Sequence, residues 1–372
     1  MKEKLRQKAL ELGFVDAGFT GAEPLDYYIK EIGSRPEMYQ WTMSENFNPL
    51  RGATPTDRYP WAKSMLVLIT TYYEKEFPPQ LTGTIGRCYL VDERKEPGEG
   101  NKRTRAYFDF LKDEGIQFRT DGETPARMSA ARAGVATYGK NCFIYARKGM
   151  LESSWITSMP ILLDVEIEPD EPSIELGCPS WCKNACIAAC PTGALYGPKK
   201  MNPLKCIAYN SYYSEGITPM ELREPMGTWV YGCDRCQDVC PRNQPWLNQD
   251  LPKNQPLMDR AKDLDLRTFL TMDQNHYETK VWPLLFYMSR NRLDKWQMNA
   301  ARALGNRGDR ADIPLLIQSL SENPHELVRA MAAWSLGKFA GDQAQTALES
   351  QRSTAEGLVK QEIEMALEGG TG

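Results

Sequence analysis

The alternation of hydrophobic and polar positions in residues 1–165 predicts a mixed α/β domain. Apolar residues at helical spacing alternate along the chain with short, continuous apolar runs of strand length, such as SMLVLITT. Gly134 closes one helix rich in small residues, and a charged stretch at 92–105 predicts a solvated loop. The predicted elements are helices at 2–12, 104–113 and 126–134 and strands at 64–71 and 155–165.

From about residue 285 onward the pattern is helical and internally similar. NAARALG at 299–305 recurs as MAAWSLG at 331–337, with a weaker echo, MALEG, at 365–369. The offset of about 31–32 residues is typical of two-helix solenoid units of the HEAT type. In such units small residues let neighbouring helices approach closely, and glycines end them. An ordinary helical bundle is the alternative interpretation.

Composition divides the chain between these two regions. Residues 166–177 are acidic and contain proline, which predicts a linker. Eight of the ten cysteines follow within 178–245, and residues 246–284 are rich in Pro, Asn and Asp. We therefore expect an α+β multidomain chain with an α/β domain at 1–165, a cysteine-rich domain at 166–245, a connector at 246–284 and helical repeats at 285–372.

The length of 372 residues and the net charge of −4 are ordinary for a globular protein of two or three domains. A net charge of this size does not by itself indicate nucleic-acid binding, but it is compatible with a local basic face. No apolar run is long enough to cross a bilayer, and the first residues are amphipathic, unlike a signal peptide. We therefore expect a cytoplasmic protein with no membrane partner. The two histidines, His276 and His325, are expected at the surface.

The cysteines form two runs that each end in Cys-Pro. In two-cluster ferredoxins the last cysteine of such a run binds the other cluster. The first three cysteines wrap one cubane, and the next enters a helix that carries it to the neighbouring cubane. The runs are Cys178-x3-Cys182-x3-Cys186-x3-Cys190-Pro191 and Cys233-x2-Cys236-x3-Cys240-Pro241, with Cys206 between them.

This crossover predicts two groups of four ligands. The first quartet, for one [4Fe–4S] cluster, is Cys178, Cys182, Cys186 and Cys240. The second quartet, for another [4Fe–4S] cluster, is Cys190, Cys206, Cys233 and Cys236. Zinc also binds four thiolates and is the alternative metal, whereas disulfides are disfavoured in a cytosolic chain.

The first run has one extra residue in each of its first two gaps, compared with the usual Cys-x2-Cys-x2-Cys-x3-Cys-Pro spacing. A spacing of four would place the thiols on one helical face, but Pro179 and the need to surround a cubane favour a loop. The remaining Cys88 and Cys142 are expected to be small, buried apolar side chains.

Four segments of the chain resemble the epoxyqueuosine reductase family: residues 131–142 (ARAGVATYGKNC), residues 154–164, the cysteine-rich region and residues 328–337 (VRAMAAWSLG). The resemblance implies an N-terminal cobalamin-binding α/β domain of nitroreductase-like fold, related to that of reductive dehalogenases. A two-cluster ferredoxin-like module and a HEAT-like domain follow it. The family reduces the epoxide of epoxyqueuosine in tRNA to an alkene. Electrons from an external low-potential donor would reach cobalt through the clusters.

The resemblance also assigns individual residues. Asp121 is the nearest match to the proton-donating aspartate of the family, and Glu123 and Tyr138 are alternatives, because the departing oxygen needs a proton. The residues placed at cobalamin are Ala133, Gly134, Tyr138, Gly139, Lys140, Asn141, Cys142, Ser154 and Trp155.

The sequence departs from the family where the mouth of the active site is expected. Asp121 is one residue closer to the Ala-Gly pair, and Thr137-Tyr138 replaces the Gly-Trp of the family. Gly86-Arg-Cys-Tyr-Leu-Val-Asp92 and a charged insertion replace Gly-Arg-Asp-Tyr-His. Two other hypotheses therefore stay open. One is a paralogue that uses the same cofactors on a small molecule, and the other is a corrinoid-binding electron-transfer protein without substrate chemistry.

A basic run near the start of the helical tail is the predicted contact for tRNA. Such a face could neutralise phosphates and make binding depend on salt. The alternative is an ordinary solvated helix face. We expect the protein to be a monomer. The residues of the basic run are Arg290, Arg292, Lys295, Arg302, Arg307 and Arg310.

Overall fold

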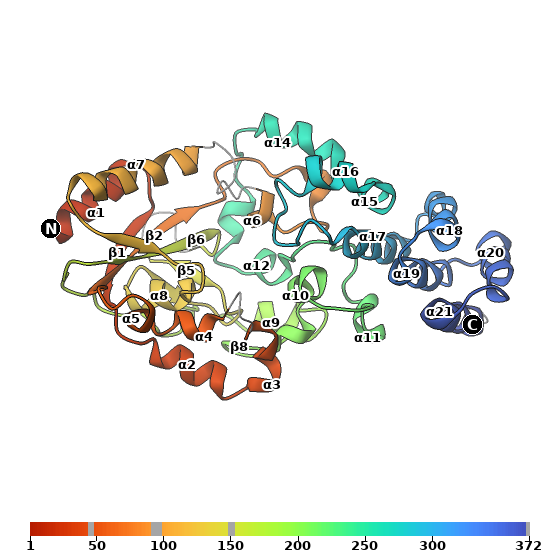
Figure 1. Cartoon of the computed structure of the whole chain (residues 1–372), viewed down its shortest axis with the longest axis horizontal. Helices are drawn as coiled ribbons and strands as arrows, with labels where there is room; N and C mark the ends of the chain where they lie inside the picture. The colour runs from red at the N-terminus through yellow and green to blue at the C-terminus, as the bar shows by residue number, and fades with distance from the viewer. Residues whose placement is uncertain (44–47, 91–98, 148–152, 370–372) are drawn as a thin grey trace. The chain divides into compact units, whose positions relative to one another are not determined.

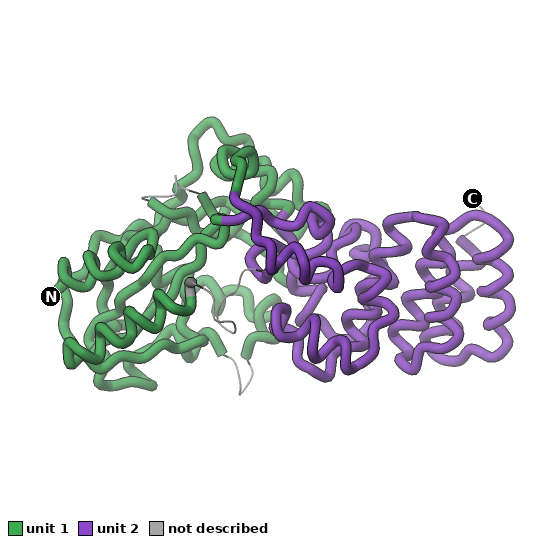
Figure 2. Tube along the Cα trace, turned by 90° about the horizontal axis from the view of Figure 1, so that it is seen from above, with its two compact units in different colours: residues 1–74, 92–203, 235–251 green, residues 75–91, 204–234, 252–372 purple. Residues whose placement is uncertain are grey.

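The computed structural model describes residues 1–43, 48–90, 99–147 and 153–369 (Figure 1). The chain divides into two compact units that each combine segments distant in the sequence (Figure 2). Unit 1 comprises residues 1–74, 92–203 and 235–251, and unit 2 comprises residues 75–91, 204–234 and 252–372. The four sequence domains differ from this division, and their boundaries stay a prediction.

Unit 1 is built on a four-stranded antiparallel sheet in the order β1-β2-β6-β3 (Figure 1). The interior strand β2 has the predicted bounds, and nearly all its residues are buried. Because side chains alternate between the faces of a strand, Leu66 and Leu68 pack into one core. Met65, Val67 and Ile69 pack into the other. The strands are β1 (Asp16–Gly21), β2 (Ser64–Thr71), β3 (Phe118–Thr120) and β6 (Ile156–Leu163).

Helices cover both faces of this sheet (Figure 1). α1 (Lys2–Glu11) and α7 (Glu99–Asp113) supply Leu5 and Tyr107 to the core around Leu66. α8 (Ala126–Arg132) supplies Ala130 to the opposite core. α7 begins at Glu99 instead of residue 104, so the charged loop is shorter than predicted. Residues 91–98, which include the first part of the charged insertion, lie outside the described part of the chain.

The predicted linker at 166–177 is bound to the α/β part of unit 1. Asp170 accepts a hydrogen bond from the Phe19 amide at 2.9 Å and forms an ion pair with Arg6 at 2.7 Å. Ser173 Oγ donates to the carbonyl of Ala136 at 2.7 Å. These bonds give the segment a fixed course despite its acidic composition.

The rest of unit 1 consists of two small hairpins and short helices. The hairpins are β4 (Ala136–Tyr138) with β5 (Ile144–Ala146) and β7 (Leu195–Gly197) with β8 (Lys200–Met201). The helices are α2 (Asp26–Gly33), α3 (Pro36–Tyr39), α4 (Pro49–Gly52), α5 (Pro55–Arg58), α9 (Ala185–Ala188), α12 (Arg235–Asp238) and α13 (Gln244–Leu247).

The helical repeats of unit 2 pack through the small residues that the sequence singles out. α17 packs against α19, and α19 packs against α21 (Figure 1). A Cβ on Gly305 would lie 2.6 Å from Ser335 Oγ, and one on Gly337 would lie 2.7 Å from the Cβ of Ala366. Gly305 lies inside α17, however, which ends at the left-handed Gly308. The five helices are α17 (Leu293–Arg307), α18 (Ile313–Glu322), α19 (Glu326–Leu336), α20 (Asp342–Arg352) and α21 (Gly357–Gly369).

The part of the predicted connector in unit 2 is largely helical. Phe269 and Tyr277 join the core around Trp296 of α17. The short helices of unit 2 are α6 (Arg87–Leu90), α10 (Ile207–Tyr212), α11 (Met220–Arg223), α14 (Gln255–Arg260), α15 (Leu266–Thr271) and α16 (Gln274–His276). Among the described residues, no helix has both the length and the apolar character needed to cross a membrane.

A buried ion pair joins α11 to the last helix. Nη1 and Nη2 of Arg223 donate to the carboxylate of Glu362, at 2.6 and 2.7 Å, and both side chains are almost fully buried. Removal of one partner leaves an uncompensated charge in the interior, which commonly costs about 3–5 kcal/mol.

We predict that Glu362→Ala lowers the free energy of unfolding of the transition that includes α21 by about 3–5 kcal/mol. Urea denaturation of the full chain, followed by circular dichroism, measures this change. Glu364→Ala on the same helix is the matched control, because Glu364 is only half-buried and should change stability by less than about 0.5 kcal/mol. Equal effects of the two variants would contradict a special role for the buried pair.

Candidate functional site

The four thiols of the first quartet lie within electrostatic reach of one another in unit 1. Burial raises the pKa of Cys186 to about 11, with further contributions from Cys240, Cys178 and Cys182. Burial also raises the pKa of Cys178, and Cys182 and Cys240 add to the effect. Four such thiols can ionise together only when positive charge lies among them, as an iron–sulfur core supplies. The structure therefore supports this grouping of ligands.

The first cysteine run is a loop, as Pro179 led us to expect. Only Cys186 lies in a helix, the single turn α9, which follows Asn184 in the left-handed conformation (φ 63°). α9 contacts α12, and Cys240 follows α12. Within the described residues, no three His, Cys, Asp or Glu side chains converge tightly enough to hold a single metal ion.

The turn of the β4–β5 hairpin donates hydrogen bonds to the cysteine segments of unit 1. The Lys140 amide donates to Cys178 Sγ at 3.3 Å, and Lys140 Nζ donates to the Cys182 carbonyl at 2.9 Å. Asn141 Nδ2 donates to the Cys236 carbonyl at 3.3 Å. From β5, Tyr145 Oη donates to Cys240 Sγ at 3.1 Å. Two donors therefore reach sulfurs of the first quartet, and one of them, Tyr145, was not singled out in the sequence.

Ser154 and Trp155, which the resemblance places at cobalamin, are fully buried in internal contacts. The Ser154 amide donates to Asn243 Oδ1 at 2.9 Å, and Ser154 Oγ accepts from Gln237 and Asn243 at 3.0 and 2.8 Å. Trp155 stacks on Tyr73 with 5.1 Å between ring centroids. Ser154 therefore fixes the chain around Cys240 from outside the thiol group.

Ala133 and Gly134 have packing roles at the end of α8. A Cβ on Gly134 would lie 2.4 Å from the carbonyl oxygen of Glu171, and the φ of Gly134 is +71°. Ala133 is buried, and its carbonyl oxygen would be 2.3 Å from a Cβ on Gly18. Tyr138, Lys140 and Cys142 are each partly exposed, so these members of the predicted cobalamin set have surface available for a ligand.

The candidate proton donors differ in how they are held. Glu123 accepts hydrogen bonds from Arg51 Nε at 2.8 Å, Arg58 Nη1 at 2.6 Å and the Asn48 amide at 2.9 Å. The hydrogen bond from Arg51 is the main cause that lowers the pKa of Glu123. Glu123 is thus held ionised, which does not suit a proton donor.

Asp121 lies in the same loop, between β3 and α8. Its Oδ2 accepts from Arg58 Nη1 at 2.7 Å, and its Oδ1 accepts from the Glu123 amide at 3.1 Å. Burial raises the pKa of Tyr138, so its phenol stays protonated, and its hydroxyl contacts Met128 Sδ at 3.9 Å. Thr124 Oγ1, in the same loop, is buried and has no hydrogen-bond partner among the described residues.

The second quartet draws its members from both units: Cys190 and Cys236 belong to unit 1, and Cys206 and Cys233 to unit 2. Within unit 2, α17 holds the backbone between Cys206 and Cys233. Asn299 Nδ2 donates to the carbonyls of Ser211 and Val230 at 2.7 and 3.1 Å. Lys295 Nζ donates to the Ser214 carbonyl at 2.9 Å.

The predicted basic face near α17 is wrong for two of its residues. Lys295 and Arg302 are fully buried, and Arg302 donates to the carbonyls of Gly227, at 2.7 Å, and Trp229. Burial lowers the pKa of Lys295 to about 7. Both side chains lie on the buried side of α17. There they donate hydrogen bonds to backbone carbonyls of unit 2.

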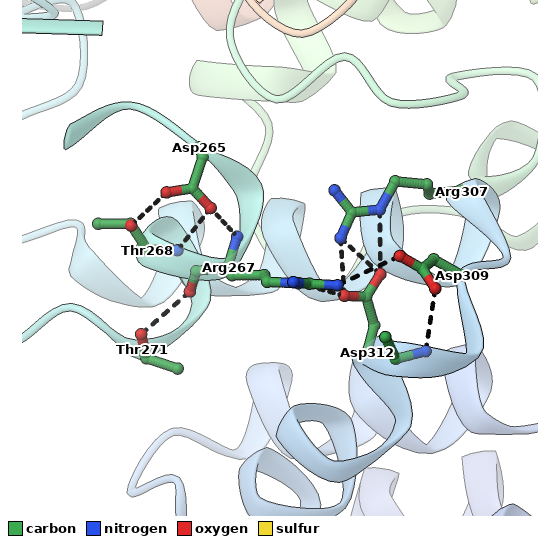
Figure 3. A network of polar contacts seen from close by, with 8 residues as sticks. Asp265, Arg267, Thr268, Thr271, Arg307, Asp309 and Asp312 are labelled. Carbon is green, nitrogen blue, oxygen red and sulfur yellow. Dashed lines mark hydrogen bonds and ion pairs between the residues drawn. The ribbon is translucent and has the colours of Figure 1, made fainter. Parts of the chain in front are cut away.

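Two more residues of the basic run are engaged in ion pairs. Arg292 binds Glu215 and Asp294, at 3.0 and 3.2 Å. Arg307 and Arg267 share the buried carboxylate of Asp312 (Figure 3). Arg290, Arg307 and Arg310 are exposed. Charge counting along the sequence could not reveal which cations have acidic partners.

The other single residues are less distinctive. We expected Cys88 and Cys142 to be buried, but both are only half-buried. His325 is exposed, and His276 is half-buried.

Comparisons with known proteins give family matches for two parts of the chain. The 4Fe-4S double cluster binding domain matches residues 178–243, and HEAT repeats match residues 284–368. These matches confirm the predicted two-cluster module and the HEAT-like domain. Over 383 residues the chain is 29% identical to the epoxyqueuosine reductase of Bacillus subtilis, with 99% of this chain and 95% of that protein covered.

Solved structures are similar over the whole length of the chain. A crystal structure of epoxyqueuosine reductase with a tRNA-Tyr epoxyqueuosine-modified tRNA stem loop has a TM-score of 0.81 and 27% identity, and covers 100% of this chain and 99% of its own. A Bacillus subtilis epoxyqueuosine reductase with its catalytic aspartate loop swung out of the active site has a TM-score of 0.80 and 27% identity, with 99% and 98% covered.

The Glu123 network predicts a dependence of stability on pH. A lowered pKa in the folded state means that Glu123 stabilises the fold above the ordinary glutamate pKa, and that this contribution is lost as the pH falls through the lowered value. We expect Glu123→Gln to be less stable than the parent at neutral pH and to approach it as the pH falls through the lowered pKa of Glu123. Thermal unfolding across pH measures this, with Glu175→Gln at an exposed site as control. A constant difference across pH would contradict the prediction.

The crossover assignment predicts which serine variants act together. Cys240→Ser and Cys186→Ser should alter the electron paramagnetic resonance (EPR) signal of the same reduced cluster, because both residues belong to the first quartet. Cys190→Ser and Cys233→Ser should alter the other signal. If Cys240→Ser instead alters the signal that Cys233→Ser alters, the crossover is absent.

Proposed function

Because this chain belongs to the epoxyqueuosine reductase family, we propose that it reduces the epoxide of epoxyqueuosine in tRNA to the alkene of queuosine. The observation that carries this proposal is the match over the whole chain to an epoxyqueuosine reductase bound to a modified tRNA stem loop. The chain is accordingly an oxidoreductase. The reaction consumes two electrons and two protons and releases the epoxide oxygen as water.

We propose that the first and second quartets each hold one [4Fe–4S] cluster. Burial and the neighbouring thiols of the quartet raise the pKa values of Cys178 and Cys186, which supports the first of these sites. We propose that cobalamin contacts Tyr138, Lys140 and Cys142, which are partly exposed, near the Asp121 loop. The buried, unpartnered Thr124 hydroxyl in that loop fits a polar ligand atom, since buried polar groups normally have partners. When bound, the clusters and the corrin supply single electrons and the reducing metal.

Asp121 is the residue that we propose as proton donor. Its carboxyl has one guanidinium partner, whereas Glu123 is bound by two arginines and a backbone amide. Protonation of Asp121 would weaken its ion pair with Arg58 and release Oδ2 toward the substrate oxygen. Glu123 then serves as the anchor of the loop, because its bonds to Arg51 and Asn48 do not involve Asp121.

The proposed partner is tRNA, and the exposed Arg290 and Arg310 are the members of the basic run that remain available for phosphate contacts, since Arg292 and Arg307 are engaged in ion pairs. Lys295 and Arg302 are removed from this surface by their burial. We further propose that the protein acts as a monomer with an external low-potential electron donor.

We predict that Asp121→Asn lowers the turnover of epoxyqueuosine-containing tRNA by about 10²–10⁴-fold. Turnover is measured with anaerobically purified protein loaded with iron, sulfide and cobalamin, by mass spectrometry of the tRNA nucleosides. The visible spectra of clusters and corrin and the affinity for tRNA should be unchanged. Asp57→Asn, at an exposed site on α5, is the control.

Absence of conversion by the parent protein with intact corrin and cluster spectra would overturn the proposed reaction. Full activity of Asp121→Asn would remove Asp121 from the mechanism and leave the reaction itself in place.

A further inference from the structure

Tyr145 places a hydroxyl group on a sulfur of the first quartet. It lies on β5, its side chain is fully buried, and its Oη donates to Cys240 Sγ at 3.1 Å. Cys240 is itself buried. A hydrogen bond in such surroundings is little weakened by water, and one to a charged acceptor is about twice as strong as a neutral bond.

The neighbours of Tyr145 fix the direction of this bond. Asn141 Nδ2 donates to Tyr145 Oη at 3.0 Å, so the hydroxyl oxygen acts as acceptor toward Asn141 and its proton is directed to the sulfur. The Arg242 guanidinium lies over the ring, 4.3 Å from its centroid. A Cβ on Gly139 would lie 2.3 Å from the ring, so glycine leaves the room that the tyrosine occupies.

All of these contacts belong to unit 1, and those of Tyr145 with Cys240 and Arg242 join the hairpin to the segment after α12. The cation over the aromatic face draws electron density from the phenol and makes its O–H a stronger donor. The Arg242 guanidinium is held in turn by the Gly177 carbonyl at 2.8 Å. The tyrosine is thus preorganised as a donor to one ligand.

Reduction of a cluster by one electron adds negative charge that is shared with its cysteine sulfurs. Hydrogen bonds to those sulfurs stabilise the more negative form and are among the factors that set the potential. We propose that the Tyr145 hydroxyl, acting through Cys240, raises the reduction potential of the cluster held by the first quartet. Tyr145 is a positioning residue and does not touch the substrate.

This inference rests on the proposed function only in that the first quartet holds a [4Fe–4S] cluster. Its test is the midpoint potential of that cluster, measured by EPR-monitored titration with dithionite on the full chain after anaerobic reconstitution without cobalamin. In Tyr145→Phe the ratio of reduced to oxidised first cluster at a fixed potential should fall about tenfold, which equals about 59 mV for one electron. The signal that Cys186→Ser alters identifies the first cluster.

Tyr107→Phe is the matched control, because Tyr107 is also fully buried and donates to the Leu5 carbonyl at 3.0 Å, in another part of unit 1. It should lose a buried hydrogen bond without a change in potential. Resonance Raman spectra give a second readout. Loss of the bond should raise the stretching frequency of an Fe–S(Cys) bond in Tyr145→Phe and not in Tyr107→Phe.

An unchanged potential and Raman spectrum in Tyr145→Phe with full iron content would overturn the inference and leave the reductase function standing. A parent protein that binds no iron would overturn both the inference and the proposed cofactors. Equal shifts of both clusters, or equal shifts in the two variants, would show a general loss of packing and would also overturn it.

Discussion

Four thiols gathered in one region, where Cys186 and Cys240 are buried and Cys178 and Cys182 half-buried, repel one another as soon as they ionise, and this constraint organises unit 1. Burial and the neighbouring sulfurs raise the pKa values of Cys178 and Cys186, so the thiolate form of the group requires a cation core. A metal site of this kind is costly to build without ligand, because the same proximity that binds the core disfavours the charged apoprotein. Hydrogen bonds from residues other than these cysteines offset part of this cost.

Those contacts come from the α/β part of unit 1. The β4–β5 hairpin supplies an amide, an ammonium group and a phenol to the cysteine segments. Ser154, two residues before β6, is hydrogen-bonded to Gln237 and Asn243 on either side of Cys240. Of the residues that the family resemblance assigns to cobalamin, Lys140, Asn141 and Ser154 hold the cysteine segments. Tyr138, Lys140 and Cys142 keep exposed surface, so Lys140 combines both properties.

Local patterns predicted much of this fold. The apolar run at 64–71 is an interior strand, and the small residues repeated after 299 lie where helices approach closely. The cysteine count and the Cys-Pro endings predicted the two-cluster module because ligand number and spacing are written directly in the sequence.

Pairing between distant side chains could not be predicted in this way. Glu123 and Arg51 form a hydrogen-bonded ion pair although they lie 72 positions apart in the sequence. A single sequence gives no signal for such a pair. Lys295 and Arg302 were interpreted as surface charges, although their spacing along α17 with Asn299 and Asn306 would have been a usable clue. Four polar residues on the apolar side of a helix indicate buried backbone acceptors opposite them.

This polar side of α17 limits how far the protein can be regarded as modular. The carbonyls of Ser211, Gly227 and Val230, which lie between Cys206 and Cys233 in the sequence, obtain their donors from the first repeat helix. A shortened chain that ended before residue 285 would leave these acceptors without donors in a dry interior. The repeats therefore stabilise the segment between Cys206 and Cys233. Exchanging them for another domain would remove the hydrogen-bond donors of this segment.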